Sequence, residues 1–193
     1  MKKVKYLMGH CTATPEGMGV SPETLKQWFM AEPPLGNGWS KVGYRTVFDL
    51  DGMADDLLMD YDMNGFIEWD EVTYGARGYN SESIHFAYVG GCDRWMKPKD
   101  TRTPAQKRSM EYYIKNTLSY YPDIKIVGHN QVNRNKDCPS FDMPTWLRSI
   151  GIEEKNIFQN QVTRMSIGSG LNPYDFDKYF IQQQIKATQW DNT

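Results

Sequence analysis

The sequence predicts an α/β fold with a central mixed β-sheet flanked by helices, followed by a short helical extension at the C-terminus. Short apolar runs typical of buried strands alternate along the chain with longer segments of helical periodicity. Strands separated by helices favour a sheet with helices packed on its faces. The pattern loosens from about residue 152, so we expect one domain over residues 1–152 and an extension over residues 153–193.

Four segments have the patterns of strands. Residues 4–8 are apolar and stop at a glycine, and residues 124–127 form a second short apolar run. Residues 84–89 are apolar on both faces, which is typical of a central strand. Residues 42–50 alternate between apolar and polar side chains and end at an Asp-Gly turn, which predicts a half-buried strand.

Capping residues mark the helices. Ser21 followed by proline predicts one helix start, and Asp142 predicts another. Residues 103–120 begin with a capping box and continue with apolar residues at helical spacing. In the extension, the Gly-Ser-rich residues 166–170 predict a linker that leads into one last helix.

Charge and composition exclude several classes of protein. The 22 Lys and Arg nearly balance the 24 Asp and Glu, and a net charge of −2 removes the usual electrostatic case for binding nucleic acid. No apolar stretch approaches the roughly 20 residues of a membrane span. The apolar run after Lys2-Lys3 is too short for a signal peptide, so we expect cytoplasmic synthesis without one. Three cysteines cannot all pair, which argues against a disulfide framework.

Two histidines and one cysteine stand where a metal site could form. His10 and His129 each follow a predicted strand, and Cys138 lies nine residues after His129 in an Asn-rich loop. Two nitrogens and one sulfur, with a fourth position left for water, are typical of catalytic zinc. Histidines at strand ends are also common as hydrogen-bonded structural residues, and cysteine is often simply buried. Residue types and spacing alone leave both interpretations open.

Four separated motifs follow one another along the chain. They are His10–Thr14, Gly38–Tyr44, Tyr88–Gly91, and His129 followed by Lys136–Asp142. In this order they resemble the zinc-dependent N-acetylmuramoyl-L-alanine amidase family, type 2, and especially its small phage members, over about residues 1–152. The resemblance implies the fold that these amidases share with peptidoglycan recognition proteins.

The resemblance also implies an activity and the residues that perform it. The matching positions make His10, His129 and Cys138 the zinc ligands, and Tyr44 and Lys136 the catalytic residues. The implied reaction is hydrolysis of the amide bond between N-acetylmuramic acid and L-alanine in bacterial peptidoglycan. One departure is the spacing of nine between His129 and Cys138, which is one more than in the phage members.

A polymeric substrate needs an open groove, and four residues are predicted to line it. Aromatic and polar side chains can stack on sugars or hydrogen-bond to peptide, although the same residues could equally pack at the rim of a groove. These predicted substrate contacts are Trp39, Arg77, Tyr79 and Asn80. The expected partner is therefore bacterial peptidoglycan.

Several functions remain as alternatives. Without a signal peptide the chain fits a phage endolysin, which is made in the cytoplasm and acts on the cell wall after release. It also fits a cytosolic amidase that recycles wall fragments, or a member of the fold that binds peptidoglycan without cutting it. A cysteine hydrolase using Cys138 with a histidine base is a further alternative.

An acidic segment contains a second motif. Asp60, Asp62, Asn64 and Glu71 satisfy the pattern of a calcium-binding loop. Glycines follow where a helix should leave the loop, and no second such loop exists to pair with it. A hairpin with its turn at Asn64-Gly65 is the alternative, in a segment, residues 49–71, that holds nine carboxylates and no Lys or Arg.

The other histidine and cysteines are expected to be bystanders. His85 should lie on the strand face opposite Ile84, in a structural or groove-lining position. Cys11 should point away from the neighbouring ligand and into the core. Cys92 follows a Gly-Gly pair in a predicted loop, where it looks like a spare thiol.

Overall fold

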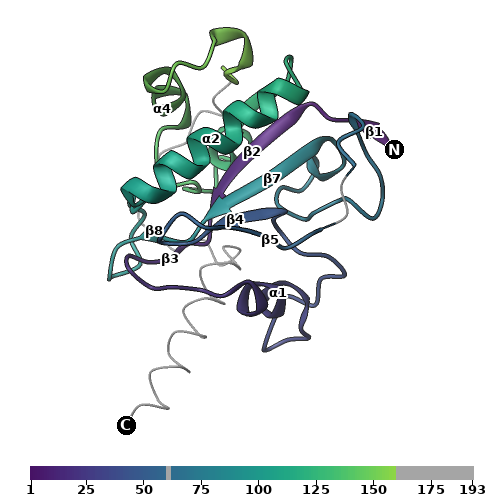
Figure 1. The fold of residues 1–193 in the computed structure, drawn as a ribbon. Helices are drawn as coiled ribbons and strands as arrows, with labels where there is room; N and C mark the ends of the chain where they lie inside the picture. Colours follow the sequence, from purple (N-terminus) through teal and green to yellow (C-terminus); the bar gives the residue numbers. More distant parts are fainter. Residues whose placement is uncertain (60–61, 160–193) are drawn as a thin grey trace.

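Five strands form the central sheet of the computed structural model, which describes residues 1–59 and 62–159 (Figure 1). Across the sheet the order is β5 (Ala54–Asp56), β4 (Thr46–Phe48), β7 (Ser83–Tyr88), β2 (Tyr6–Cys11) and β9 (Lys125–Gly128). β4, β7, β2 and β9 run parallel, and β5 pairs antiparallel with β4. The predicted mixed sheet is confirmed, and the segment predicted to be central lies at its centre.

Two small sheets and the helices complete the described part of the chain. β1 (Lys2–Lys3) pairs with β6 (Phe66–Ile67), and β3 (Thr14–Pro15) pairs with β8 (Gly91–Cys92). The helices are α1 (Pro22–Met30), α2 (Pro104–Tyr120), α3 (His129–Val132) and α4 (Met143–Ser149). Short 3₁₀ turns lie at Asn80–Glu82 and Glu154–Asn156.

The predicted caps begin the three longer helices. The Ser21 hydroxyl accepts a hydrogen bond from the Thr24 N–H at 3.2 Å, and the Asp142 carboxylate caps α4. Thr103 and Gln106 form the predicted capping box, with hydrogen bonds of 3.0 and 2.9 Å. These bonds satisfy backbone N–H groups that lack a partner within the helix, so each helix begins where its cap stands.

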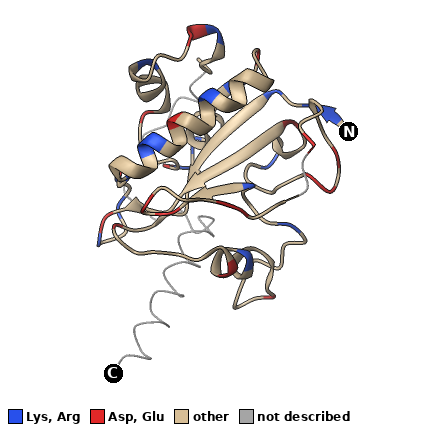
Figure 2. Ribbon diagram, viewed as in Figure 1, with Lys and Arg blue, Asp and Glu red and all other residues tan. Residues whose placement is uncertain are grey.

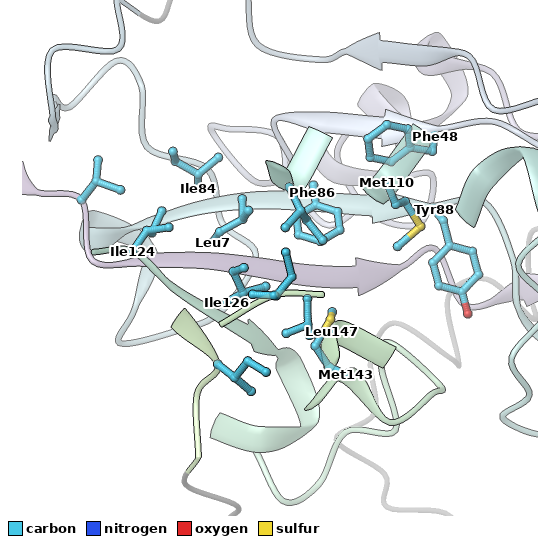
Figure 3. Packing of buried hydrophobic residues seen from close by; sticks show 14 of the residues in the cluster. Leu7, Phe48, Ile84, Phe86, Tyr88, Met110, Ile124, Ile126, Met143 and Leu147 are labelled. Carbon is cyan, nitrogen blue, oxygen red and sulfur yellow. The ribbon is translucent and has the colours of Figure 1, made fainter. Parts of the chain in front are cut away.

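Helices cover both faces of the sheet. α2 and α4 pack on one face, where Phe86, Met110 and Leu147 belong to the largest cluster of buried apolar side chains (Figure 3). α1 packs on the other face, where Leu25 and Trp28 contact the neighbouring strands β4 and β7. Alternate residues of one strand therefore enter different environments.

Charged residues lie outside the two innermost strands. In Figure 2, β2 and β7 are tan along their length, and charges of both signs lie on α2 and on the loops. Both strands are buried on both faces, as expected for parallel strands with helices on each side. None of the helices in the described part of the chain has both the length and the apolar character needed to span a lipid bilayer.

The first predicted strand is wrong at both ends, because Gly9 does not stop it. β2 runs from Tyr6 to Cys11, and Gly9 lies in mid-strand, paired with Phe86 of β7 and Gly128 of β9. A Cβ atom at Gly9 would lie 2.3 Å from the Met143 side chain and 2.9 Å from the Phe86 ring. Glycine is needed here for close packing, and His10 consequently lies within the strand.

The strand predicted over residues 42–50 is shorter than expected. Only Thr46–Phe48 form β4, and the predicted Asp-Gly turn then leads into β5. Before β4, the Val42 carbonyl accepts from the Tyr74 N–H and the Gly43 backbone packs against the Phe29 ring. These contacts direct residues 42 and 43 over α1, so this part of the backbone does not pair with β7.

Two further local predictions are wrong. The Asn64-Gly65 hairpin does not form in the described residues, because β6 pairs with β1 rather than with the segment before Asn64. Cys92 lies in β8 instead of a loop. The predicted linker over residues 166–170 and the last helix lie outside the described residues, and the domain boundary at residue 152 stays a prediction. Through Phe158 the chain still contacts the edge strand β9.

Candidate metal centre

The central sheet holds His10. The residue lies next to the end of β2, between β7 and β9, and its side chain is 1% exposed. It projects from the face that α1 covers, opposite to the face of Leu7. Pairing on both sides of β2 fixes the backbone, so the imidazole starts from a rigid position.

His129 lies at the junction of β9 and α3. Gly128 ends the strand, and the Gln131 side chain accepts the Gly128 N–H at 2.8 Å. The next N–H, of Asn130, donates to the Cys138 carbonyl at 2.7 Å. This bond ties the returning loop to the start of α3, so the loop brings Cys138 back beside His129.

Two further bonds hold the loop that carries Cys138. The Tyr88 hydroxyl donates to the Pro139 carbonyl at 2.8 Å. The Cys11 N–H donates to Cys138 Sγ at 3.3 Å. The first bond comes from the end of β7 and the second from the end of β2, so the two central strands position the thiol.

The three side chains converge as a zinc site requires. The ligand atoms of His10, His129 and Cys138 lie within 4.8 Å of one another, and this is the one such group of His, Cys, Asp or Glu found in residues 1–59 and 62–159. His10 Nδ1 lies 3.5 Å from Cys138 Sγ. In a tetrahedral zinc site, nitrogen and sulfur ligand atoms lie about 3.5 Å apart. The donor set and this spacing both fit zinc.

Burial and nearby charges keep His10 and His85 neutral. Burial, together with the positive charges of His129, His85 and Lys136, lowers the pKa of His10 well below its usual value. Burial also lowers the pKa of His85, to about 3, and burial raises the pKa of the Cys138 thiol. Neutral imidazoles offer lone pairs to a metal, but the thiol must lose its proton when a metal binds, so binding should weaken in acid.

His85 is a contact of the site that the sequence interpretation missed. It lies in β7, is fully buried, and its Nδ1 is 2.9 Å from Nε2 of His10. The prediction of the strand face is confirmed, and the expectation that His85 is not a metal ligand stays a prediction, although its ring contacts that of His10. The signal was available in part, since strand alternation places His85 and His10 on the same face once β7 pairs with β2.

An open cavity with an empty volume of about 860 Å³ adjoins the cluster. His129 and Cys138 line it together with Lys136, and the aromatic side of its wall includes Trp28 and Trp39. The Trp39 ring stacks on Phe29 with centroids 5.6 Å apart and an angle of 9° between the planes. The cavity is therefore polar near the cluster and aromatic beside α1.

Tyr44 and Lys136 both line this cavity, as the predicted roles require. Tyr44 stands before β4 instead of at a strand end, and its hydroxyl donates to the Cys11 carbonyl at 3.3 Å. Its ring centroid is 5.1 Å from that of His10. Lys136 is half-buried in the loop before Cys138, and its charge acts on His10.

Of the four predicted substrate contacts, Trp39 alone is in the cavity wall. The Tyr79 ring packs edge-to-face on Tyr6, at the start of β2 rather than at its end. The Asn80 side chain accepts the Ala76 N–H at 2.8 Å, and Arg77 is exposed. The cavity wall instead includes Tyr74 and Gly75, which the sequence interpretation did not select.

The calcium-loop motif stays a prediction. Asp60 lies outside the described residues. The Glu71 carboxylate accepts N–H groups of Glu68 at 2.8 Å and of Asp62 at 3.4 Å, and the Asp62 carboxylate accepts the Asn64 N–H. No helix begins directly after Glu71, where the chain continues in turns and loop as far as the 3₁₀ turn at Asn80–Glu82. Calorimetric titration with Ca²⁺ tests this motif, and an absence of heat would dispose of it.

The arrangement fits a metal-dependent hydrolase. Three protein donors would leave one tetrahedral position of a bound metal for a reactant, and two of these donors line an open cavity. Residues 1–141 match the sequence model of the N-acetylmuramoyl-L-alanine amidase family. The chain belongs to this family, as the four motifs predicted.

Phage endolysins are among the similar sequences. The endolysin of Escherichia phage T7 is 32% identical over 139 residues, which are 71% of this chain and 81% of the endolysin. The endolysin of Enterobacteria phage K11 is 30% identical over 140 residues, 72% of this chain and 83% of that protein.

Solved structures share the fold. The Ph2119 endolysin, from a bacteriophage of Thermus scotoductus MAT2119, has a TM-score of 0.60 at 19% identity, with 79% of this chain and 88% of that chain covered. Bumblebee PGRP-SA has a TM-score of 0.59 at 16% identity, with 83% and 87% covered. The predicted fold class is thus confirmed.

Proposed function

We propose that this amidase is an endolysin that hydrolyses the bond between N-acetylmuramic acid and L-alanine in bacterial peptidoglycan, with a zinc ion held by His10, His129 and Cys138. The observation that carries the proposal is the convergence of these three ligand atoms within 4.8 Å beside an open cavity. Membership of the amidase family and similarity to phage endolysins support the same activity. As an endolysin, the chain would be made in the cytoplasm and act on the wall after release.

The geometry indicates the atoms through which His10 and Cys138 would bind the metal. His10 would bind through Nδ1, which faces Cys138 Sγ. Cys138 would bind as a thiolate, and the Cys11 N–H that already points at the sulfur would stabilise its negative charge. Bound zinc would supply Lewis-acid chemistry, lowering the pKa of a water molecule toward about 7 and polarising the scissile carbonyl.

Lys136 and Tyr44 are the residues proposed to act on the substrate. Negative charge develops on the carbonyl oxygen as the amide is attacked, and a fixed positive charge nearby stabilises it. Lys136 is two residues from Cys138 and lines the cavity, so its ammonium is available for this role. Tyr44 can hydrogen-bond to the reacting groups through its hydroxyl, which the Cys11 carbonyl holds near the His10 ring.

The aromatic side of the cavity would bind the sugar and peptide. Trp39 is the substrate contact best supported, because it lines the cavity and Phe29 holds its ring. Arg77, Tyr79 and Asn80 remain predicted contacts for parts of the polymer that extend beyond the cavity. Retention of all three ligands favours an enzyme over a protein that only binds peptidoglycan.

Mass spectrometry of the products from purified peptidoglycan tests the proposal. We expect release of stem peptides with a free L-alanine amino group and intact glycan strands. A chelator should abolish the release and added zinc should restore it, whereas alkylation of the zinc-loaded protein should matter little. Release that survives chelation but is lost on alkylation would point to a cysteine hydrolase. Action on small muropeptides alone, with intact wall untouched, would point to a recycling enzyme.

A further inference from the structure

His85 occupies an unusual position for a side chain that is not a ligand. It is fully buried in the central strand β7, and its Nδ1 contacts Nε2 of His10 at 2.9 Å. Its other nitrogen, Nε2, is buried and has no hydrogen-bond partner in the structure. A buried polar atom without a partner costs folding free energy, and an apolar side chain of similar size would avoid that cost. The contact with His10 therefore calls for a functional reason.

The geometry of the cluster determines the protons on both rings. Nδ1 of His10 faces Cys138 Sγ, so this nitrogen must present its lone pair to the metal. The proton of neutral His10 then lies on Nε2, from which it is donated to His85. His85 must accept at Nδ1 and carry its own proton on Nε2, which is the atom without a partner.

We propose that His85 is a positioning residue that holds His10 in the tautomer and ring orientation needed to bind zinc. The role rests on the proposed zinc function. Ligating histidines commonly donate their second N–H to a carboxylate or a carbonyl, and such partners set the affinity for the metal. In this protein another neutral imidazole is the acceptor, so the ring is oriented without a buried negative charge.

The surroundings of His85 hold it in place. The ladder between β2 and β7 pairs Met8 with His85, which fixes the strand register behind both histidines. On the other side, a Cβ atom at Gly75 would lie 2.4 Å from His85 Nδ1 and 2.9 Å from the Gly43 carbonyl oxygen. The Gly75 backbone thus packs directly against the ring, which leaves it little room to turn away from His10.

His85 is not a fourth ligand. It contacts the Nε2 edge of the His10 ring, whereas Cys138 lies on the Nδ1 edge. A metal among the three donors would be bound on the Nδ1 edge, with the ring of His10 between it and His85. In agreement with this, His85 does not belong to the group of converging ligand atoms, which consists of His10, His129 and Cys138.

A matched pair of variants tests the role. His85→Asn keeps an acceptor near the position of Nδ1, and His85→Leu removes it with a side chain of similar bulk. We expect His85→Leu to weaken zinc binding by about 10- to 100-fold, the range for lost partners of ligating histidines. His85→Asn should stay within about threefold of the parent chain if the hydrogen bond is what matters.

The dissociation constant is measured by competition with a chromophoric chelator, and the absorption spectrum of the cobalt-loaded protein reports the ligand geometry. Melting of the metal-free forms shows whether each variant folds. Equal weakening in both variants, or none in His85→Leu, overturns the role. If the parent itself fails to bind zinc, the proposed function falls and the role with it. If the parent binds and His85→Leu binds equally well, the positioning role falls alone.

Nitrogen-15 NMR of the unchanged chain provides a test that needs no variant. In the zinc-loaded protein the proton of His10 should be on Nε2, coupled to an acceptor nitrogen of His85. A His10 ring that is protonated on Nδ1, or that binds zinc through Nε2, overturns the proposal even if His85→Leu does not fold.

Discussion

The two faces of strands β2 and β7 differ in chemistry although they share one backbone. Toward α2 and α4 the strands present Leu7, Phe86 and Tyr88, which pack in a buried apolar cluster (Figure 3). Toward α1 they present His10 and His85, which are equally buried but polar. A shift of one residue in the register would exchange the two sets.

The comparison shows how a buried polar site can be held in place. Buried polar groups add little to the free energy of unfolding even when they are hydrogen-bonded. They lower it when a partner is missing, as at His85 Nε2. The apolar face supplies burial free energy of about 25 cal/mol per Å². Because both faces share one backbone, this free energy also holds in position the face that carries His10 and His85, here called the site face. Changes on the apolar face should therefore affect folding, and changes on the site face should affect metal and substrate.

Removal of one ligand should give the largest effect. Cys138→Ser replaces a thiolate with a hydroxyl that binds zinc poorly, so we expect amidase activity to fall about a thousandfold, or roughly 4 kcal/mol. Release of stem peptides and zinc content per protein measure the change. The metal-free variant should melt close to the metal-free parent. Full activity with bound zinc would remove Cys138 from the ligand set.

A change on the apolar face of the same strand should lower stability and leave zinc affinity unchanged. Leu7→Ala, three residues before His10, removes a fully buried side chain and should lower the free energy of unfolding by about 2–5 kcal/mol. Urea unfolding measures this loss. Zinc affinity of the folded variant should match that of the parent. A large loss of zinc affinity with unchanged stability would show that the two faces are not separable.

Acid should destabilise the metal-free chain through the site face. Burial lowers the pKa of His85 to about 3, while the same group in the unfolded chain titrates near its usual value of about 6.5. Between these values the unfolded chain binds a proton that the folded chain excludes, so the free energy of unfolding falls as pH falls. From pH 7 to pH 5 the loss from His85 alone should be about 2 kcal/mol.

The depressed pKa of His10 acts in the same direction. Urea unfolding at both pH values measures the loss, and His85→Asn, which has no titrating side chain at this position, should lose less than the parent. An equal loss in the variant would assign the acid sensitivity to other groups.

Local signals predicted most of the fold. The helix caps, the apolar run of β7 and the Asp-Gly turn each depend on residues close together in sequence, and each is confirmed. The extent of β2 was wrong because the reason for Gly9 is contact with Phe86 and Met143, which are distant in sequence. The predicted strand that contains β4 was too long because the backbone before β4 bonds to Tyr74 and packs against α1 instead of pairing in the sheet.

The site was predicted by motif order more than by spacing. His10 and His129 lie 119 positions apart, and only the parallel pairing of β2 with β9 brings their strands together. His85 was missed because alternation gives the face of a residue but not the register that sets it beside His10. Tyr79 was predicted to line the groove because aromatic side chains can stack on sugars, whereas its ring packs on Tyr6 at the start of β2.

Loss of a cavity aromatic should give the smallest effect. Trp39→Ala removes a ring that lines the cavity and that Phe29 holds in place, so we expect the KM for peptidoglycan fragments to rise about tenfold, or roughly 1.4 kcal/mol. The kcat should stay within about twofold, because stacking of this kind stabilises bound substrate and transition state alike. Initial rates of peptide release at several fragment concentrations separate the two constants.

A matched control lies on α2, whose helix packs on the other face of the sheet. Tyr112 is exposed there, so Tyr112→Ala removes an aromatic ring far from the cavity and should leave KM unchanged. Arg77→Ala, at an exposed residue outside the cavity wall, should raise KM less than Trp39→Ala does. A larger effect at Arg77 would mean that the polymer runs over the surface near Arg77, and a fall in kcat alone for Trp39→Ala would place that ring beside the reacting bond.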